Sequence, residues 1–482
     1  MLANILVYDI GSTYTKVAAF SEKDETLSYL GRGQSPTTLA NVMDGARGAE
    51  TALAVQGITF APDVRRYSSC SAAGGLRMVA LGYMPRVTVK AAKEVSMTAG
   101  ARVMQVVSAD EPLSFRKEVL REINPDIILL SGGTDGGDED CVQENADMIC
   151  ELKSKATVIL GCNRFAQRTA AEKFKAAGID YVRVPNIMPT IHELNVAPAR
   201  TAIHEQFIRQ ITRARGLMEF QTGLTDKVVV PTPGAVLLAS ELLAKGSYEQ
   251  EGIGSVILVD IGGATTDIHS ALPELENLTI EERGLIINNE KQFSYRTVEG
   301  NLGLRVSAMG IPDAVGPKAV VRAMDGDFGV TGEDVLDYTE GLESHTDHIP
   351  ADEREASLDR ALASCAISVA LRRHAGFYAQ ESDPVMGIMA GTAMGRDLRN
   401  VDRVLCVGGI FVHTEEEKGK ALVRRCFADP GISLLPIREP KILLDRDYIF
   451  YALGVLGKHY PDMVLDFMKK HYMIDKNKEN EL

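Results

Sequence analysis

The feature that most constrains the fold is a strand-turn sequence that occurs twice. Residues 7–16 read VYDIGSTYTK, and residues 258–267 read LVDIGGATTD. Asp9 and Asp260 are 260 − 9 = 251 positions apart, and Gly11 and Gly262 keep the same offset. Each stretch predicts two strands joined by a turn that contains glycine. A repeat half the chain apart predicts duplicated lobes that face each other across a cleft.

The residues of the two turns suit a phosphate group held beside a metal ion. Glycine lets backbone N–H groups approach phosphate oxygens, and hydroxyl side chains add donors. A carboxylate at each strand end can hold Mg²⁺ through water, because Mg²⁺ loses its water ligands reluctantly. Lys16 supplies a compact positive charge for a β- or γ-phosphate. Two facing carboxylates would repel each other, so Asp9 and Asp260 together predict a metal ion.

Length and charge narrow the class of protein. The chain has 482 residues, of which 45% are hydrophobic and 24% are charged, as in an ordinary globular protein. This length predicts roughly two to four folding units. The net charge of −14 comes from 52 basic and 66 acidic residues. We therefore expect neither nucleic acid nor an anionic membrane as the main partner.

The cysteines and the apolar runs predict a cytoplasmic protein. The seven cysteines are an odd number without Cys-x-x-Cys spacing, which favours reduced thiols over disulfides or a zinc site. The N-terminus lacks the basic and long apolar regions of a signal peptide. The apolar runs, such as residues 126–133 (DIILLSGG), are far shorter than the ~18 residues that a membrane span requires.

Between residues 87 and 190 the sequence alternates between buried-strand and amphipathic-helix patterns. The predicted strands lie in residues 102–109, 125–133, 156–163 and 180–186. Such alternation predicts a parallel sheet covered by helices, here as an inserted unit. Within it, residues 129–140 (LLSGGTDGGDED) are either a second anion site or the turn that begins the next helix. We favour the turn, because its acidic residues suit a helix N-terminus and would repel a phosphate.

The two turns resemble the phosphate-1 and phosphate-2 motifs of the actin, sugar kinase and heat-shock chaperone superfamily. Three further segments follow in superfamily order. Residues 232–246 (TPGAVLLASELLAKG) resemble the first connecting helix, and residues 447–457 (DYIFYALGVLG) resemble the second. Residues 404–411 (VLCVGGIF), with Gly408 and Gly409, resemble the adenosine motif. The resemblance implies a two-lobed α/β, actin-like ATPase made of duplicated ribonuclease H-like domains.

The resemblance also implies a division of the chain. The first lobe would comprise residues 1–86 and 191–250, the latter with the first connecting helix, and the inserted α/β subdomain would comprise residues 87–190. The second lobe would comprise residues 251–290 and 401–460, interrupted by a mostly helical insertion at residues 291–400. Residues 461–482 would form a C-terminal tail.

Roles for the site residues are carried over from the matching motifs. The cofactors implied are ATP and Mg²⁺, bound between the lobes, with Asp9 and Asp260 as metal-binding residues. The residues expected to be catalytic are Asp9, Asp260, Lys16 and Thr265. Those expected to bind the nucleotide are Gly11, Ser12, Thr13, Gly262, Gly263, Ala264, Gly408 and Gly409.

One departure from the pattern bears on catalysis. Some chaperone relatives carry a glutamate at the start of the first connecting helix, where it helps to order the attacking water. Residues 228–236 of this chain read VVVPTPGAV and contain no carboxylate. The general base is therefore unassigned, and we expect slow ATP turnover of the kind that suits a switch.

The amino-acid sequences of both turns and of the insert resemble those of one narrow family. The chain is similar to the MutL-type accessory proteins of adenosylcobalamin-dependent glutamate (methylaspartate) mutase. The resemblance implies an ATP-dependent reactivating chaperone that releases damaged cobalamin from an inactivated mutase and admits intact coenzyme. The partners implied are the client mutase and a nucleotide, while the oligomeric state stays open.

Other functions of the same fold remain possible at this stage. A small-molecule kinase would need an aspartate as general base, for which Asp267 and Asp135 are the candidates. An activator of radical acyl-CoA dehydratases would need an iron–sulfur cluster, for which Cys141 and Cys150 are the only close pair in the right half of the chain. A filament or cell-division protein is a weaker third alternative.

Overall fold

The computed structural model describes residues 1–11, 14–37, 41–70, 76–82, 101–190, 195–211, 217–275, 292–382 and 388–472. The chain divides into two compact units. Unit 1 consists of Met1–Ser21 and Tyr29–Ala235, and unit 2 consists of Glu22–Ser28 and Val236–Leu482.

A five-stranded sheet in unit 1 carries the first aspartate turn. Its order is β10-β4-β1-β2-β3, with β1 antiparallel to β2 and parallel to β4, and with β4 parallel to β10. The apolar run of β1 is buried over most of its length, which places this strand at the centre of the sheet. The strands are β1 (Leu2–Ile10), β2 (Tyr14–Lys23), β3 (Thr26–Pro36), β4 (Thr59–Cys70) and β10 (Val229–Pro231).

Unit 2 contains a sheet with the same topology. Its order is β13-β12-β11-β16-β17, so the third, second, first, fourth and fifth strands follow one another as they do in unit 1. Strand β11 is antiparallel to β12 and parallel to β16. The strands are β11 (Val256–Ile261), β12 (Thr266–Ala271), β13 (Ser294–Glu299), β16 (Arg403–Val407) and β17 (Lys441–Leu444). The repeated sheet confirms the predicted α/β fold class and the predicted duplication of one topology.

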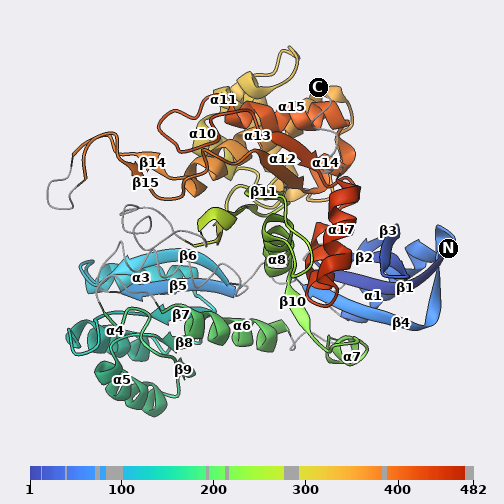
Figure 1. Cartoon of the computed structure of the whole chain (residues 1–482). Helices are drawn as coiled ribbons and strands as arrows, with labels where there is room; N and C mark the ends of the chain where they lie inside the picture. Colours follow the sequence, from blue (N-terminus) through green and yellow to red (C-terminus); the bar gives the residue numbers. More distant parts are fainter. Residues whose placement is uncertain are drawn as a thin grey trace. The chain divides into compact units, whose positions relative to one another are not determined.

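A third sheet forms the insert of unit 1 (Figure 1). It is fully parallel, in the order β6-β5-β7-β8-β9. Its elements are β5 (Leu76–Gly82), β6 (Ala101–Ser108), α3 (Leu113–Ile123), β7 (Ile127–Leu130), α4 (Asp140–Glu151), β8 (Thr157–Leu160), α5 (Arg164–Ala177) and β9 (Tyr181–Arg183). The four strands predicted from sequence are confirmed. The sheet also contains β5, which precedes residue 87, because a short apolar run does not reveal which sheet it joins.

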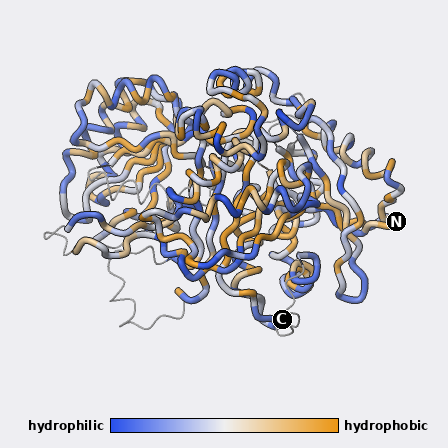
Figure 2. Tube along the Cα trace, turned by 90° about the horizontal axis from the view of Figure 1, so that it is seen from above, coloured by the Kyte–Doolittle hydropathy of each residue, from blue (hydrophilic) through white to orange (hydrophobic). Residues whose placement is uncertain are grey.

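Both faces of the insert sheet are buried, which explains why its strands are continuously apolar. Val79, Ile128 and Leu160 lie in one buried cluster with residues of α3, α4 and α5. Leu129 and Ile159 lie in another cluster, which includes residues of α6 (Ala197–Ile211). In Figure 2 the strands are largely hydrophobic and the surrounding helices carry the hydrophilic residues.

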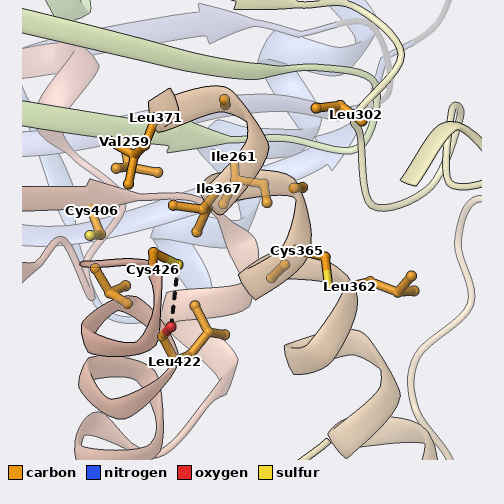
Figure 3. Packing of buried hydrophobic residues seen from close by; sticks show 14 of the residues in the cluster. Val259, Ile261, Leu302, Leu362, Cys365, Ile367, Leu371, Cys406, Leu422 and Cys426 are labelled. Carbon is orange, nitrogen blue, oxygen red and sulfur yellow. Dashed lines mark hydrogen bonds between the residues drawn. The ribbon is translucent and has the colours of Figure 1, made fainter. Parts of the chain in front are cut away.

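The core of unit 2 forms where one long helix packs on its sheet. Helix α13 (Glu353–His374) contributes buried residues that pack against β11 and β16 and against α15 (Glu416–Phe427). Figure 3 shows Ile367, Val259, Cys406 and Cys426 in this cluster. None of the seven cysteines, all within the described ranges, forms a disulfide, and six of them are buried. The prediction that the thiols are buried is confirmed for these six cysteines.

The remaining helices complete the two units. Helix α17 (Pro461–His471) forms the first part of the segment predicted as a tail, and its apolar residues Val464, Leu465 and Met468 are buried.

No helix among the described residues has the length and apolarity needed to cross a membrane. The other elements are α1 (Val42–Val55), α7 (Leu217–Thr222), α8 (Thr232–Lys245), η1 (Pro273–Leu275), α10 (Gly310–Val315), α11 (Pro317–Ala323), α12 (Gly332–Ser344), β14 (Phe377–Tyr378), β15 (Ala393–Met394), α14 (Gly409–His413) and α16 (Phe450–Gly457).

Candidate functional site

The first aspartate turn joins β1 to β2. The backbone N–H of Gly11 donates to the carbonyl oxygen of Tyr14 at 3.0 Å and closes the turn. A Cβ atom at Gly11 would lie 2.5 Å from that same oxygen, so the turn requires glycine at this position. Ser12 and Thr13, which we predicted to bind phosphate, lie outside the described residues.

Asp9 is the penultimate residue of β1 and is held by three donors. The Lys16 Nζ atom lies 3.3 Å from Asp9 Oδ2, since the two residues are directly opposite each other on β1 and β2. Ser69 Oγ donates to Asp9 Oδ1 at 3.1 Å, and Thr232 Oγ1 donates to the same oxygen at 2.6 Å. Asp9 is only 2% exposed, so these donors compensate a carboxylate that water barely reaches.

The three parallel strands of this sheet explain how the donors converge. Strands β1, β4 and β10 end at one edge, where Ser69 is paired with Asp9 and Thr232 directly follows β10. Sequence reasoning missed both hydroxyl residues. Thr232 stands at the start of α8, the predicted first connecting helix, where some relatives carry a glutamate. A threonine hydroxyl orients the Asp9 carboxylate but cannot replace a carboxylate as a general base.

The second aspartate turn joins β11 to β12 and repeats the backbone of the first. The N–H of Gly262 donates to the carbonyl oxygen of Thr265 at 2.9 Å. Asp260, which is half-buried, lies opposite Asp267 in the strand pair. Thr265, which we predicted to be catalytic, donates its hydroxyl to Asp267 Oδ2 at 2.9 Å.

Asp267 is also bound by an arginine of the neighbouring strand. Arg296 Nη2 and Nε lie 2.6 and 2.9 Å from Asp267 Oδ1, and both residues are nearly buried. An aspartate engaged in this way is poorly suited to take a proton from a substrate hydroxyl. The geometry therefore gives no support to the small-molecule kinase alternative through Asp267.

A loop that sequence reasoning missed braces the second turn. The N–H groups of Leu304 and Arg305 donate to the carbonyl oxygens of Gly262 and Gly263 at 3.0 and 2.8 Å. The Arg305 side chain lies against Gly263 and extends to Asp359, with 2.7 Å between Nη2 and Oδ2. No motif in the sequence marks this contact. A guanidinium group is thus fixed beside a turn that we predict to bind phosphate.

The predicted adenosine motif lies at the same edge of the unit 2 sheet as the second turn. Gly408 follows β16, whose Val407 is paired with Asp260 of β11. Its φ of +144° and the 2.3 Å that would separate a Cβ from the Ile261 oxygen both require glycine. Gly409 is exposed and begins α14.

The Asp9 carboxylate fits a magnesium ion that keeps its waters. A carboxylate offers about four acceptor positions, and Asp9 uses three of them for Lys16, Ser69 and Thr232. One position therefore remains for a water ligand of the ion. Within the described ranges, no group of three or more His, Cys, Asp or Glu side chains could cage an ion by itself. An ion at these turns would therefore depend on water and phosphate oxygens, as Mg²⁺ does in phosphate-binding sites.

The cysteine pair considered for an iron–sulfur cluster is poorly placed for that role. Cys141 and Cys150 lie nine positions apart on the single helix α4. Burial raises the pKa of the Cys141 thiol to about 11 and also raises the pKa of the Cys150 thiol. Cluster ligands are thiolates, which such surroundings disfavour.

Comparisons with known proteins are dominated by one family. The sequence pattern of the MutL protein family matches residues 5–472. The chain is 36% identical over 476 residues to Protein MutL of Clostridium tetanomorphum, covering 97% of this chain and 98% of that protein.

Solved structures resemble the chain more distantly. A glycerol dehydratase reactivase aligns with 93% of this chain and 99% of its own, at 11% identity and a TM-score of 0.31. A carbohydrate kinase from Novosphingobium aromaticivorans aligns with 95% of this chain and 91% of its own, at 13% identity and a TM-score of 0.27. These TM-scores are too low to support an argument. The sequence match spans nearly the whole chain, however, and the chain belongs to the MutL protein family.

Proposed function

We propose that this protein is an ATP-dependent reactivating chaperone of an adenosylcobalamin-dependent mutase such as glutamate mutase. It hydrolyses ATP slowly, in a Mg²⁺-dependent reaction, and uses the cycle to exchange damaged cobalamin for intact coenzyme in the cytoplasm. Membership of the MutL family supports the choice of client. The observation that carries the ATPase part is the first turn, where Lys16 and two hydroxyl groups converge on the buried carboxylate of Asp9.

The residues of each turn take part in phosphate binding. Backbone N–H groups of the glycine turns and the Lys16 ammonium group bind phosphate oxygens. Gly11, Ser12, Thr13 and Lys16 bind phosphate from the first turn, and Gly262, Gly263, Ala264 and Thr265 do so from the second. Gly408 and Gly409 lie against the adenosine.

Asp9 and Asp260 hold Mg²⁺ through its water ligands. The bound ion neutralises charge on the phosphate oxygens. Ser69 and Thr232 keep the Asp9 carboxylate in one orientation, so that it accepts hydrogen bonds from the ion's water shell. Arg305 supports the second turn from behind, because its backbone binds Gly263 and its guanidinium group is fixed by Asp359.

A nucleotide can act on a client protein only through different affinities for two conformations. ATP favours the conformation that binds the inactivated mutase, and ADP favours the one that releases it. A slow step between them suits this task. The start of α8 offers the hydroxyl of Thr232 rather than a carboxylate, which agrees with slow hydrolysis.

Reactivation of a poisoned mutase tests the proposal. Glutamate mutase inactivated with hydroxocobalamin is mixed with this protein, ATP, Mg²⁺ and fresh coenzyme, and recovered activity is measured. We expect recovery with the unaltered protein and with Asp347→Asn, a matched change at an exposed loop aspartate. We expect at least about a hundredfold slower ATP hydrolysis and no recovery with Asp260→Asn or Lys16→Gln.

Two results would contradict the proposal. Unchanged Mg²⁺-dependent hydrolysis in Asp260→Asn would remove that carboxylate from the site. Transfer of phosphate to sugars or short carboxylic acids, faster than transfer to water, would identify a small-molecule kinase instead.

A further inference from the structure

The insert of unit 1 has a topology that commonly carries a ligand. Its parallel strands follow the order β6-β5-β7-β8-β9, in which the direction of succession reverses once, between the first and third strands along the chain. In open parallel sheets with such a reversal, ligands bind outside the carboxyl ends of the strands, at the reversal itself. The proposed ATPase function makes no use of this edge, although the insert accounts for a large part of unit 1.

A cavity of about 430 Å³ lies at the same edge of the sheet, but beside β7, β8 and β9 rather than at the reversal. It is lined by the loop after β7, the first turns of α5 and the segment after β9, whose strands are neighbours in the sheet. Its volume falls in the range of about 300–1,000 Å³ that is typical of small-molecule sites. Its polar lining residues are Asp135, Arg164, Gln167, Arg183, Asn186 and Asn195.

Asp135, the acidic residue of the cavity, already accepts hydrogen bonds from neighbouring segments of the insert. Asp135 Oδ1 accepts hydrogen bonds from the backbone N–H of Arg164 at 2.9 Å and from Asn186 Nδ2 at 2.9 Å. Asn186 is 4% exposed and also donates to the carbonyl oxygen of Gly133 at 3.1 Å. Asp135 thus holds the glycine-rich loop against α5 and the segment after β9, which leaves it poorly placed as a kinase base.

The two arginines point to the charge of the ligand. Arg183 makes one hydrogen bond within the described part of the chain, from Nε to Gln167 Oε1 at 3.4 Å, so both its terminal amino groups remain available. Gln167 is 4% exposed and donates to the carbonyl oxygens of Cys162 and Val184, which fixes the amide that orients Arg183. Arg164 lies at the limit of an ion pair with Asp135, at 4.0 Å, and its side chain is 68% exposed.

The acidic stretch after the glycine-rich loop does not oppose an anion in the cavity. Asp138, Glu139 and Asp140 lie at the start of α4 and are absent from the cavity lining. Asp138 Oδ2 accepts the backbone N–H of Cys141 at 3.2 Å, which stabilises the first turn of that helix. The turn-forming interpretation of residues 129–140 therefore holds for these acids, while Asp135 next to them belongs to the cavity.

We propose that the insert binds a small organic anion through a carboxylate or phosphate group held by Arg183 and Arg164. Guanidinium groups bind both kinds of oxyanion in a bidentate manner, and the amide-fixed Arg183 is arranged for this before the ligand arrives. The site goes beyond the proposed ATPase and does not depend on it. The residues that would hold this anion are different from those of the aspartate turns.

Calorimetric titration of the full chain tests the site with two probes, succinate and inorganic phosphate. We expect at least one probe to bind with a stoichiometry of one to the insert. Arg183→Gln should weaken that binding by about tenfold or more, because a hydrogen bond to a charged group is lost. Arg164→Gln should weaken it less, since that side chain shares its charge with Asp135.

Matched variants locate the binding. Arg121→Gln removes the same charge from the exposed last turn of α3, at the opposite edge of the sheet, and should leave the affinity unchanged. Lys16→Gln should also leave it unchanged, although it abolishes the proposed ATPase. The proposal is overturned if neither probe binds, if Arg121→Gln and Arg183→Gln weaken binding equally, or if only Lys16→Gln does so. The last result would assign the phosphate to the first turn.

Discussion

In the first aspartate turn, the residue seven positions after the aspartate is Lys16, and in the second turn it is Asp267. Both lie directly across the strand pair from the turn's own aspartate. The backbone hydrogen bond that closes each turn is nearly the same, at 3.0 and 2.9 Å. Two copies of one backbone therefore carry opposite charges at the same place.

The two turns also differ in the cation that pairs with the aspartate and in how deeply that cation is buried. The Lys16 side chain is 17% exposed, so solvent reaches part of it. In the second turn the cation is Arg296 on the neighbouring strand, and it is almost completely buried with Asp267. We infer that the first cation serves phosphate binding and that the second serves the stability of the sheet.

The largest expected effect separates these two cations. Arg296→Leu leaves the Asp267 carboxylate buried without its ion-pair partner, which should destabilise unit 2 by about 3–5 kcal/mol. Lys16→Gln should cost only about 1.5 kcal/mol, because Ser69 and Thr232 still donate to Asp9. Urea denaturation of both variants gives the two values.

A surface ion pair provides the control for this measurement. Arg373→Gln breaks the contact with Glu299, and the Arg373 side chain is 51% exposed, so a loss below about 1 kcal/mol is expected. Equal losses for Arg296→Leu and Lys16→Gln would show that the two turns do not differ in the way described.

How far the sequence predicts this molecule depends on the range of each contact. The repeated Asp-Ile-Gly stretches predict both strand pairs, because each pair is formed by residues close together in the chain. Thr232 is 223 residues away from Asp9, and no local pattern reveals that they meet. The same holds for Arg296, which reaches Asp267 only through the pairing of β12 with β13.

The insert shows a similar limit. Four of its strands are predicted because each is a short apolar run between helices. The membership of β5 in this sheet is not predicted, since it depends on pairing with β6 and β7. The cavity residues come from three separate segments of the chain. Only the fold brings Arg183 beside Arg164.

The two sheets also differ in the residue that directly follows their fifth strand. Thr232 follows β10 in unit 1, and Asp445 follows β17 in unit 2. Asp445 is completely buried, and its Oδ2 accepts the backbone N–H of Phe450 at the start of α16 at 2.8 Å. Burial raises the pKa of Asp445 to about 6.

Stability should therefore depend on pH through Asp445. The folded protein binds this proton more tightly than the unfolded chain, whose aspartates have a pKa of about 3.9. The stabilisation is complete below about pH 4 and is lost as the pH rises to about 6, by roughly 3 kcal/mol in total. Urea denaturation of the unaltered protein and of Asp445→Asn at several pH values should show this loss only in the former.

A nearby histidine makes a control necessary. His471 Nε2 lies 3.2 Å from Asp447 Oδ2, and the charge of His471 also acts on the Asp445 carboxyl. Asp447→Asn removes that ion pair and keeps Asp445. If Asp447→Asn removes as much of the pH dependence as Asp445→Asn does, the histidine pair rather than the buried carboxyl is responsible.

An effect smaller than those expected for Arg296 and Asp445 concerns the hydroxyl group of Thr232, which follows the fifth strand in unit 1. Thr232→Val keeps the side-chain shape but removes the donor that lies 2.6 Å from Asp9 Oδ1, so a loss of about 1–2 kcal/mol is expected. Thr232→Ser keeps the donor and should cost less, which urea denaturation can resolve. Because Asp9 then loses one of its orienting contacts, Thr232→Val should also slow ATP hydrolysis, whereas Thr232→Ser should not. Equal stability of the two variants would mean that the hydroxyl contributes nothing to holding Asp9.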